Sequence, residues 1–186
     1  MNASAPFPPI VAVSSCGNIQ RPPPGHIPRL TLQQRLLAPD CRLRLLIGPA
    51  GFGKTVLLAD CARECPLQCG LLWLNCAGSG LNADQLAQQL GRLLDYPAQL
   101  TADEVLLALA QETRQLWIML NDYPVRPDST LDEYLNQLLS VTPAGVCWWL
   151  GSRRRPNCNL SRLLLEGELL ELGATDLAFT AAEVAD

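Results

Sequence analysis

The sequence predicts an α/β fold: an open, mainly parallel sheet with helices on both faces. Segments with strand character alternate with segments with helix character, an order typical of parallel sheets. The strand candidates are short apolar runs, as expected for strands buried on both faces, and the helix candidates carry leucines three and four residues apart. With 186 residues, 48% of them hydrophobic and 17% charged, the chain fits one globular domain.

A proline-rich leader is expected to precede the folded part. Residues 1–25 hold prolines at positions 6, 8, 9, 22, 23 and 24, a composition typical of an extended or disordered segment. This segment has no basic region ahead of an apolar run, so it does not read as a signal peptide. We therefore expect one folded domain over residues 26–186.

The elements are predicted in chain order from patterning and caps. A short helix is expected to start at Thr31 as N-cap and to end before Pro39. A capping box, Thr101 with Glu104 three residues later, marks the start of another helix. The predicted strands are 43–48, 70–75, 116–122, 145–153 and 169–173, and the other predicted helices are 54–64, 83–96, 101–114 and 130–141.

A phosphate-binding loop lies between the first strand and the helix that follows it. The residues Gly48, Pro49, Ala50, Gly51, Phe52, Gly53, Lys54 and Thr55 match the pattern GxxxxGK[ST]. Glycines let such a loop turn its backbone N–H groups toward phosphate oxygens, and the helix N-terminus adds positive potential. Lys54, the one lysine in a chain with thirteen arginines, would reach the β and γ phosphates, and Thr55 would offer a hydroxyl to Mg²⁺.

The strand over 116–122 ends in the best candidates for a partner to this loop. A P-loop needs an acidic residue at the end of a neighbouring strand to hold Mg²⁺ and polarise water, and Asn121 and Asp122 follow four apolar residues here. The alternative is a strand that merely ends in an Asn-Asp turn. The functional interpretation makes Thr55, Asn121 and Asp122 the magnesium site and Asp122 the catalytic carboxylate.

Three arginines follow the strand over 145–153, at the sheet edge where open α/β folds bind nucleotides. Arg153 could sense a γ-phosphate or belong to a solvated basic loop, and the sequence does not decide between the two. For Arg154 and Arg155 the solvated loop is the favoured interpretation.

Cysteines and charge exclude several other functions. Cys61 and Cys65 are spaced to share a helix face and Pro66 argues against extending that helix to Cys69, so small buried apolar residues are favoured over a metal site. The net charge of −4 gives no basic footprint for DNA, and no apolar run is long enough to cross a membrane. We expect a cytoplasmic protein that does not itself bind DNA or membranes.

Several separated motifs together resemble one family. They are HIPRLTLQQRLL, PAGFGKT, LWIMLND, LGSR and LLELGATDLAFTAAEV, spread over residues 26–186. The chain resembles the N-terminal nucleotide-binding domain, a P-loop NTPase domain, of the large ATP-dependent LuxR-type transcription regulators, which belong to the signal-transduction ATPases with numerous domains. The resemblance implies an ATP/ADP switch in which ADP holds a resting form, while ATP with an inducer permits self-association of the full-length regulator.

The resemblance also implies roles for single residues. Ile27, Pro28 and Arg29 would lie near the adenine base, the segment from Gly48 to Val56 would hold the phosphates, and Arg153 would be the sensor arginine. The family carries two acidic residues where this chain has Asn121 and Asp122, which implies at most a slow ATPase. Two alternatives remain open: a stand-alone small-molecule kinase or ATPase on the same loop, and an interaction domain with a vestigial nucleotide site.

Overall fold

Five parallel strands form a single sheet in the computed structural model, which describes residues 19–38, 41–77, 81–95, 100–126 and 129–179. Their order is β2-β3-β4-β1-β5, and each paired strand runs parallel to its neighbour. The strands are β1 (Leu43–Ile47), β2 (Gly70–Asn75), β3 (Leu116–Tyr123), β4 (Val146–Ser152) and β5 (Leu169–Leu172). The predicted open parallel sheet is confirmed.

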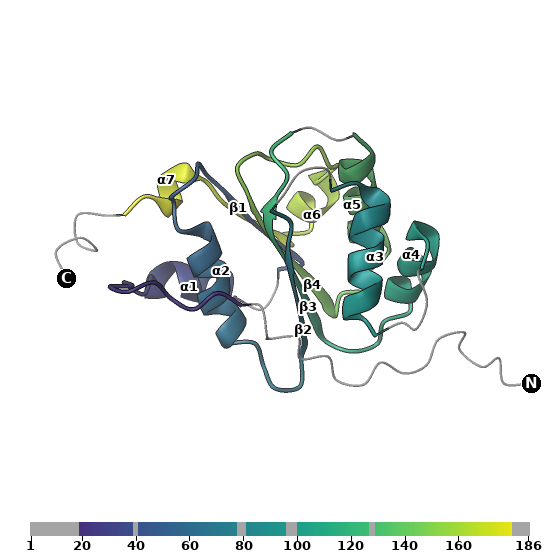
Figure 1. Cartoon of the computed structure of the whole chain (residues 1–186), viewed down its shortest axis with the longest axis horizontal. Coiled ribbons are helices and arrows are strands. Elements are labelled where there is room, and N and C mark those ends of the chain that lie inside the picture. Colours follow the sequence, from purple (N-terminus) through teal and green to yellow (C-terminus); the bar gives the residue numbers. More distant parts are fainter. Residues whose placement is uncertain (1–18, 39–40, 78–80, 96–99, 127–128, 180–186) are drawn as a thin grey trace, which may run out of the picture.

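Helices cover both faces of the sheet, as Figure 1 shows with the sheet seen nearly edge-on. One face carries α1 (Leu30–Leu36), α2 (Lys54–Arg63) and α7 (Ala174–Leu177), whose apolar residues share one core cluster with the sheet. The other face carries α3 (Ala83–Leu93), α4 (Ala102–Ala110), α5 (Ser129–Val141) and α6 (Ser161–Leu165). The α/β class with helices on both faces is therefore confirmed.

Alternation along each strand divides the two cores. On β3, Ile118 and Leu120 face the cluster with α3 to α6, while Met119 faces the cluster with α1 and α2. Successive side chains of a strand point to opposite faces, so a strand buried on both sides must be apolar throughout. This explains the continuous apolar runs that marked the strands in the sequence.

The first helix begins earlier than predicted. Its N-cap is Arg29 and its first residue Leu30, so the prediction that Thr31 caps it is wrong. The backbone carbonyl of Arg29 already accepts the N–H of Gln33 at 2.9 Å, which places Thr31 inside the first turn. The helix ends at Leu36, and Pro39, predicted to end it, lies outside the described residues.

Among the later helices, the predicted cap of α4 is confirmed, but two helices end earlier than predicted. Thr101 and Glu104 form the predicted capping box, with Thr101 N donating to Glu104 Oε2 at 2.8 Å. α4 stops at Ala110, short of the predicted end at residue 114, and α2 stops at Arg63, so Cys65 does not lie on the helix with Cys61. The four- and five-residue helices α7 and α6 were not predicted, because they are too short to show a period.

The described end of the leader lies against α2. Ile19 packs on the core cluster of α1 and α2, and Arg63 Nη2 donates to the carbonyl of Gln20 at 2.6 Å. Residues 1–18 lie outside the described part, so the leader over 1–25 and the domain start at residue 26 stay predictions. Among the described helices, none has the length and apolar character that crossing a membrane requires.

Candidate functional site

The P-loop turns from the carboxyl end of β1 into the first turn of α2. Gly51 and Gly53 adopt left-handed backbone conformations, with φ of 85° and 73°. Residues with a Cβ rarely adopt these φ values, which explains the glycines at both positions. Gly53 is also the N-cap of α2, so the loop delivers its backbone N–H groups directly to the helix N-terminus.

Lys54 folds back onto the loop that precedes it. Its Nζ donates to the carbonyl oxygens of Gly48 at 2.6 Å and Pro49 at 2.7 Å, and the residue is only 8% exposed. Burial lowers the pKa of Lys54 below its usual value; Arg153 lowers it further, and Asp122 opposes the shift. The ammonium group is therefore held by two neighbouring carbonyl oxygens at the start of the loop.

Thr55 is joined to the end of β3. Its Oγ1 donates to Asn121 Oδ1 at 2.8 Å, and Asn121 Nδ2 lies 3.4 Å from Asn75 Oδ1 at the end of β2. The strand that ends in Asn121 was expected to neighbour the strand before the P-loop, but β4 lies between β3 and β1. The contact crosses β4 at Gly151, where an added Cβ would lie 2.8 Å from Leu58 Cδ1 and 3.7 Å from Asn121 Oδ1.

Asp122 sits in a bulge beside Asn121. The pairing of β3 with β4 shifts between Leu120 and Tyr123, and Asp122 has a φ of 54°. Aspartate tolerates this left-handed conformation better than most residues, and bulges redirect side chains at the ends of strands. The Asp122 carboxylate is one-third exposed and lies 3.8 Å from Arg153 Nε.

Arg154 is held in a buried network, which corrects its prediction as a solvated residue. Its guanidinium donates to both oxygens of Asp132, at 2.7 and 2.8 Å, and the Asp132 side chain is 2% exposed. Tyr123 Oη and the backbone N of Asn157 donate to the same carboxylate at 2.9 and 2.7 Å. The network fixes the segment after β4 that carries Arg153.

Arg155 remains half exposed, as predicted, and pairs with Glu171 at 3.2 Å. Arg153 is also half exposed, and it is the arginine of this segment that lies beside Asp122. The structure thus brings Lys54, Thr55, Asn121, Asp122 and Arg153 to one edge of the sheet.

A small pocket, here the lateral pocket, lies beside the P-loop between the segment before α1 and α2. Its volume is about 180 Å³ and most of its lining is apolar. The lining includes Ile27, Arg29, Gly53, Val56 and Phe179. Pro28 does not line it, although the resemblance placed Pro28 with Ile27 and Arg29.

Arg29 connects the two ends of the described chain at this pocket. Its Nη1 donates to the carbonyl of Leu177 at 2.6 Å and its Nη2 to that of Ala178 at 2.9 Å. The guanidinium also lies 4.7 Å from the centre of the Phe179 ring. Arg29 therefore holds Phe179 at the lateral pocket, a role for Phe179 that no pattern in the sequence indicated.

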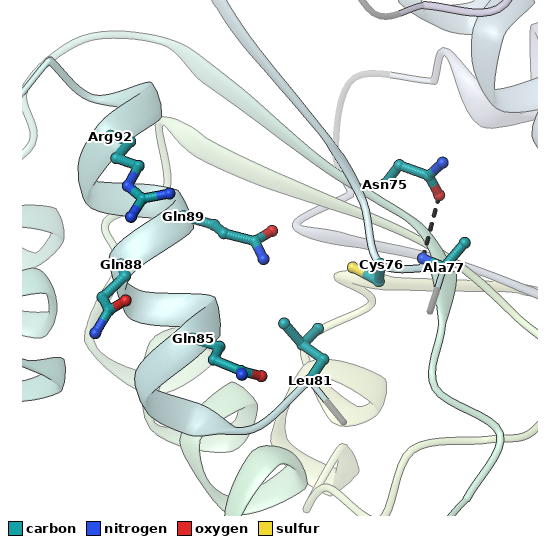
Figure 2. Close-up of a pocket in the computed structure, with 8 residues that line it drawn as sticks. All are labelled: Asn75, Cys76, Ala77, Leu81, Gln85, Gln88, Gln89 and Arg92. Atoms are coloured by element: carbon teal, nitrogen blue, oxygen red, sulfur yellow. Dashed lines mark hydrogen bonds between the residues drawn. The ribbon is translucent and has the colours of Figure 1, made fainter. Parts of the chain in front are cut away.

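A second cavity, here the amide pocket, lies at the carboxyl end of β2 and along α3 (Figure 2). Its volume is about 300 Å³, and its lining comprises Asn75, Cys76, Ala77, Leu81, Gln85, Gln88, Gln89 and Arg92. The side chain of Gln89 points from α3 toward Asn75 and Cys76 in the figure. No P-loop residue lines this cavity, and the Asn75–Asn121 contact connects it to Thr55.

No protein-family model matches the chain. Among curated proteins, the HTH-type transcriptional regulator MalT of Yersinia pestis (strain Pestoides F) is 25% identical over 184 residues, covering 86% of this chain and 20% of MalT. MalT of Cronobacter sakazakii (strain ATCC BAA-894) is 26% identical with the same coverage. The chain is thus homologous to MalT over most of its length, which confirms the resemblance, and it spans about a fifth of these relatives.

Solved structures support the fold alone. A chain in the structure of Drosophila ORC bound to DNA matches with a TM-score of 0.51 at 16% identity, covering 84% of this chain and 93% of that chain. A chain in the structure of Drosophila ORC bound to GC-rich DNA and Cdc6 matches with the same TM-score and identity, covering 84% and 57%. These matches agree with an α/β fold built on an open parallel sheet.

Proposed function

We propose that this chain is the ATP/ADP-binding switch domain of a LuxR/MalT-type transcription regulator, with slow or absent hydrolysis. The observation that carries the proposal is the complete P-loop, Gly48 to Thr55, in a strand-to-helix turn with Thr55 bonded to Asn121. Homology to MalT gives this site its regulatory context. A transcription regulator in a bacterium would work in the cytoplasm.

The phosphates would occupy the space now spanned by Lys54. Its two acceptors, the carbonyls of Gly48 and Pro49, are neutral. A β or γ phosphate is a charged acceptor, and hydrogen bonds between ionised groups are the stronger ones. The side chain can thus exchange its loop contacts for phosphate contacts with a short movement, while the N–H groups of the loop and of α2 surround the remaining oxygens.

The adenine base is assigned to the lateral pocket. This pocket adjoins Gly53 and Val56, so a ligand bound by the P-loop can extend into it. A volume of about 180 Å³ is below the ~300–1,000 Å³ of sites for whole drug-sized ligands. It therefore suits one part of a nucleotide, with Ile27 offering apolar contact and Phe179 an aromatic ring.

The donor set for Mg²⁺ fits a weakly held ion. Thr55 Oγ1 and Asn121 Oδ1 are hard oxygen donors 2.8 Å apart, but both are neutral. Asp122 supplies the one carboxylate of the predicted metal residues, and it faces Arg153 at 3.8 Å. Mg²⁺ favours carboxylates together with phosphate oxygens, so here it would be held mainly by the nucleotide and Thr55. When bound, the ion would neutralise phosphate charge.

Arg153 and Asp122 form the part of the site that can respond to a γ-phosphate. The pair is long at 3.8 Å and both side chains are partly exposed, so its contribution to stability is small. A γ-phosphate would offer Arg153 a stronger partner and release the Asp122 carboxylate. That exchange would distinguish ATP from ADP, because ADP lacks this group.

DNA binding and assembly are assigned to other parts of such a regulator. The net charge of −4 does not favour contact with DNA phosphates. We propose that the chain binds adenine nucleotide and Mg²⁺ but not DNA or membranes, and that self-association belongs to the full-length regulator.

Thermal unfolding of the purified chain with ATP, ADP or neither, combined with a phosphate-release assay, tests the proposal. A rise in the unfolding temperature with slow or no release supports a switch. Rapid transfer of phosphate to a small-molecule acceptor would show a kinase instead. No response to either nucleotide at millimolar concentration, with and without Mg²⁺, would contradict the proposal and indicate a vestigial site.

A further inference from the structure

Two cysteines flank the tight turn that joins α2 to β2, at the end of α2 opposite the P-loop. Cys65 follows the last residue of the helix, Arg63, by two positions, and Cys69 directly precedes the first residue of the strand, Gly70. The backbone N of Cys69 donates to the carbonyl of Pro66 at 2.8 Å, which closes a four-residue turn. Cys65 Sγ lies 3.8 Å from the carbonyl oxygen of Cys69. The turn thus brings two side chains four positions apart to the same place.

The direction of the pKa shift sets Cys69 apart from five other described cysteines. A hydrogen bond from the Cys65 thiol is the main cause that lowers the pKa of Cys69, and it outweighs burial, which opposes ionisation. By contrast, burial raises the pKa of Cys61, Cys76 and Cys158 to about 12.

Burial also raises the pKa of Cys41 and Cys147. Only thiolates react readily with oxidants, so the described thiols other than this pair are protected by their surroundings.

The pair is also open to small reagents. Cys65 and Cys69 are both partly exposed and line a cavity of about 430 Å³. Arg21 and Arg63 line the same cavity, and Leu67 between the two cysteines is fully exposed. An acidic, accessible cysteine beside a second thiol is the arrangement found in peroxide-reactive proteins.

We propose that Cys65 and Cys69 form a redox-active dithiol that hydroperoxides convert to an intramolecular disulfide. The Cys69 thiolate attacks the peroxide, the O–O bond breaks, and Cys69 becomes a sulfenic acid while the departing oxygen leaves as an alcohol, or as water from hydrogen peroxide. The Cys65 sulfur then displaces the sulfenic hydroxyl, which leaves as water, and the S–S bond forms. Two thiols are oxidised by two electrons and one peroxide is reduced; a cellular dithiol would restore the pair by exchange.

The disulfide would join the carboxyl end of α2 to the start of β2 without touching the P-loop. The proposal is therefore independent of nucleotide binding. The sequence interpretation of Cys65 and Cys69 as small buried residues is wrong, because both are partly exposed; of the three cysteines it covered, only Cys61 is buried.

The test treats the reduced full chain with one equivalent of hydrogen peroxide, blocks the remaining thiols with N-ethylmaleimide and measures the mass. We expect the chain to lose two hydrogen atoms and to carry two fewer N-ethylmaleimide labels than the untreated chain. Digestion with chymotrypsin, which can cut after the exposed Leu67, should leave the Cys65 and Cys69 fragments joined until a reductant is added. Oxidation of other cysteines first, or no disulfide between these two, would overturn the proposal.

Variants separate the two roles. Cys65→Ser should stop at the sulfenic acid of Cys69, which dimedone traps, and Cys69→Ser should remove both the trapping and the disulfide. Cys147→Ser, in β4, is the matched control and should oxidise as the wild type does. In the wild type, iodoacetamide at low concentration should label Cys69 at least about tenfold faster than Cys41. Equal labelling of the two, or a Cys65→Ser variant with no trapped Cys69, would also contradict the assignment.

Discussion

Thr55 on the first turn of α2 donates a 2.8 Å hydrogen bond to Asn121 on β3, across a strand that contributes only a glycine at that point. The hydroxyl expected to meet Mg²⁺ thus already contacts the residue at the end of β3. In this contact Asn121 acts through its carbonyl oxygen, which has no formal charge. The slow hydrolysis expected of this site depends on that missing charge.

Asn121→Asp should raise the affinity for Mg²⁺ in the presence of ATP, the hydrolysis rate, or both. The change keeps the acceptor for Thr55 and adds the negative charge that Mg²⁺ prefers. Phosphate release and magnesium titration of the ATP complex measure the two effects. Asn75→Asp, which adds the same charge one strand further from Thr55, is the control and should do less. Wild-type turnover near 1 per second or faster, or no change in Asn121→Asp, would show that Asn121 is not at the metal position.

Gly151→Ala should weaken the site by disturbing the space between α2 and β3. The new methyl would lie 2.8 Å from Leu58 Cδ1, a fully buried side chain that has little room to move. We expect a loss of roughly 1–3 kcal/mol in the free energy of unfolding, with weaker nucleotide binding. Denaturant unfolding and calorimetry measure both.

Gly91→Ala on α3 is the matched control for that substitution. Its added methyl would meet its neighbours at 3.7–3.8 Å, an ordinary contact, and alanine favours the helix. This variant should therefore be as stable as the wild type or more so. If Gly151→Ala behaves like Gly91→Ala, the close approach across β4 is not important.

Asp132→Asn should destabilise the chain at neutral pH by roughly 3 kcal/mol, the lower end of the cost of breaking a buried ion pair. Burial raises the pKa of the Asp132 carboxyl, but hydrogen bonds from Arg154, the Asn157 backbone and Tyr123 more than offset this, so its pKa lies below the usual value. A lowered folded-state pKa stabilises the fold above the unfolded value of about 4 and loses that effect as the pH falls through the folded value.

The difference in unfolding free energy between wild type and Asp132→Asn should therefore shrink as the pH drops below about 4. Urea unfolding at a series of pH values measures it. Glu133→Gln, an exposed neighbour on the same helix, is the control and should change stability little at any pH. A difference that does not depend on pH would show that Asp132 is not charged in the folded chain.

Duplex DNA should not bind the chain specifically at physiological ionic strength. The net charge is −4, and of the three arginines after β4, Arg154 is partly buried and paired with Asp132, and Arg155 pairs with Glu171. Fluorescence anisotropy with labelled duplexes at several salt concentrations measures binding. A salt-dependent affinity in the micromolar range at 150 mM salt would contradict this expectation.

Local patterns predicted the elements of this fold well. Apolar runs located each of the five described strands, and the Thr101–Glu104 spacing located the start of α4, because strand burial and helix caps depend on neighbouring residues. The P-loop was also recognisable from neighbouring residues, because its geometry needs glycines at fixed positions. The cap at Thr31 was wrong because a backbone carbonyl, not a side chain, starts α1.

Relations between distant residues could not be predicted in this way. The order of the strands, which inserts β4 between β1 and β3, depends on packing of the whole sheet. Asp132 and Arg154 are 22 positions apart, so nothing local marked Arg154 as the partner of a buried carboxylate. Phe179 lies at the lateral pocket next to Arg29, a residue 150 positions earlier in the chain, so no local pattern could place it there.

Nucleotide binding through Lys54 is the central claim, and calorimetric titration of ATP and ADP into the wild type and Lys54→Ala tests it most directly. Lys54 is the one lysine of the chain, and its loss removes a charge-assisted contact to the phosphates. We expect the wild type to bind both nucleotides and the variant to bind them about 10- to 150-fold more weakly, equivalent to roughly 1.5–3 kcal/mol. Circular dichroism must show that the variant is folded. Equal affinity in a folded Lys54→Ala variant, or a wild type that binds neither nucleotide, would contradict the account.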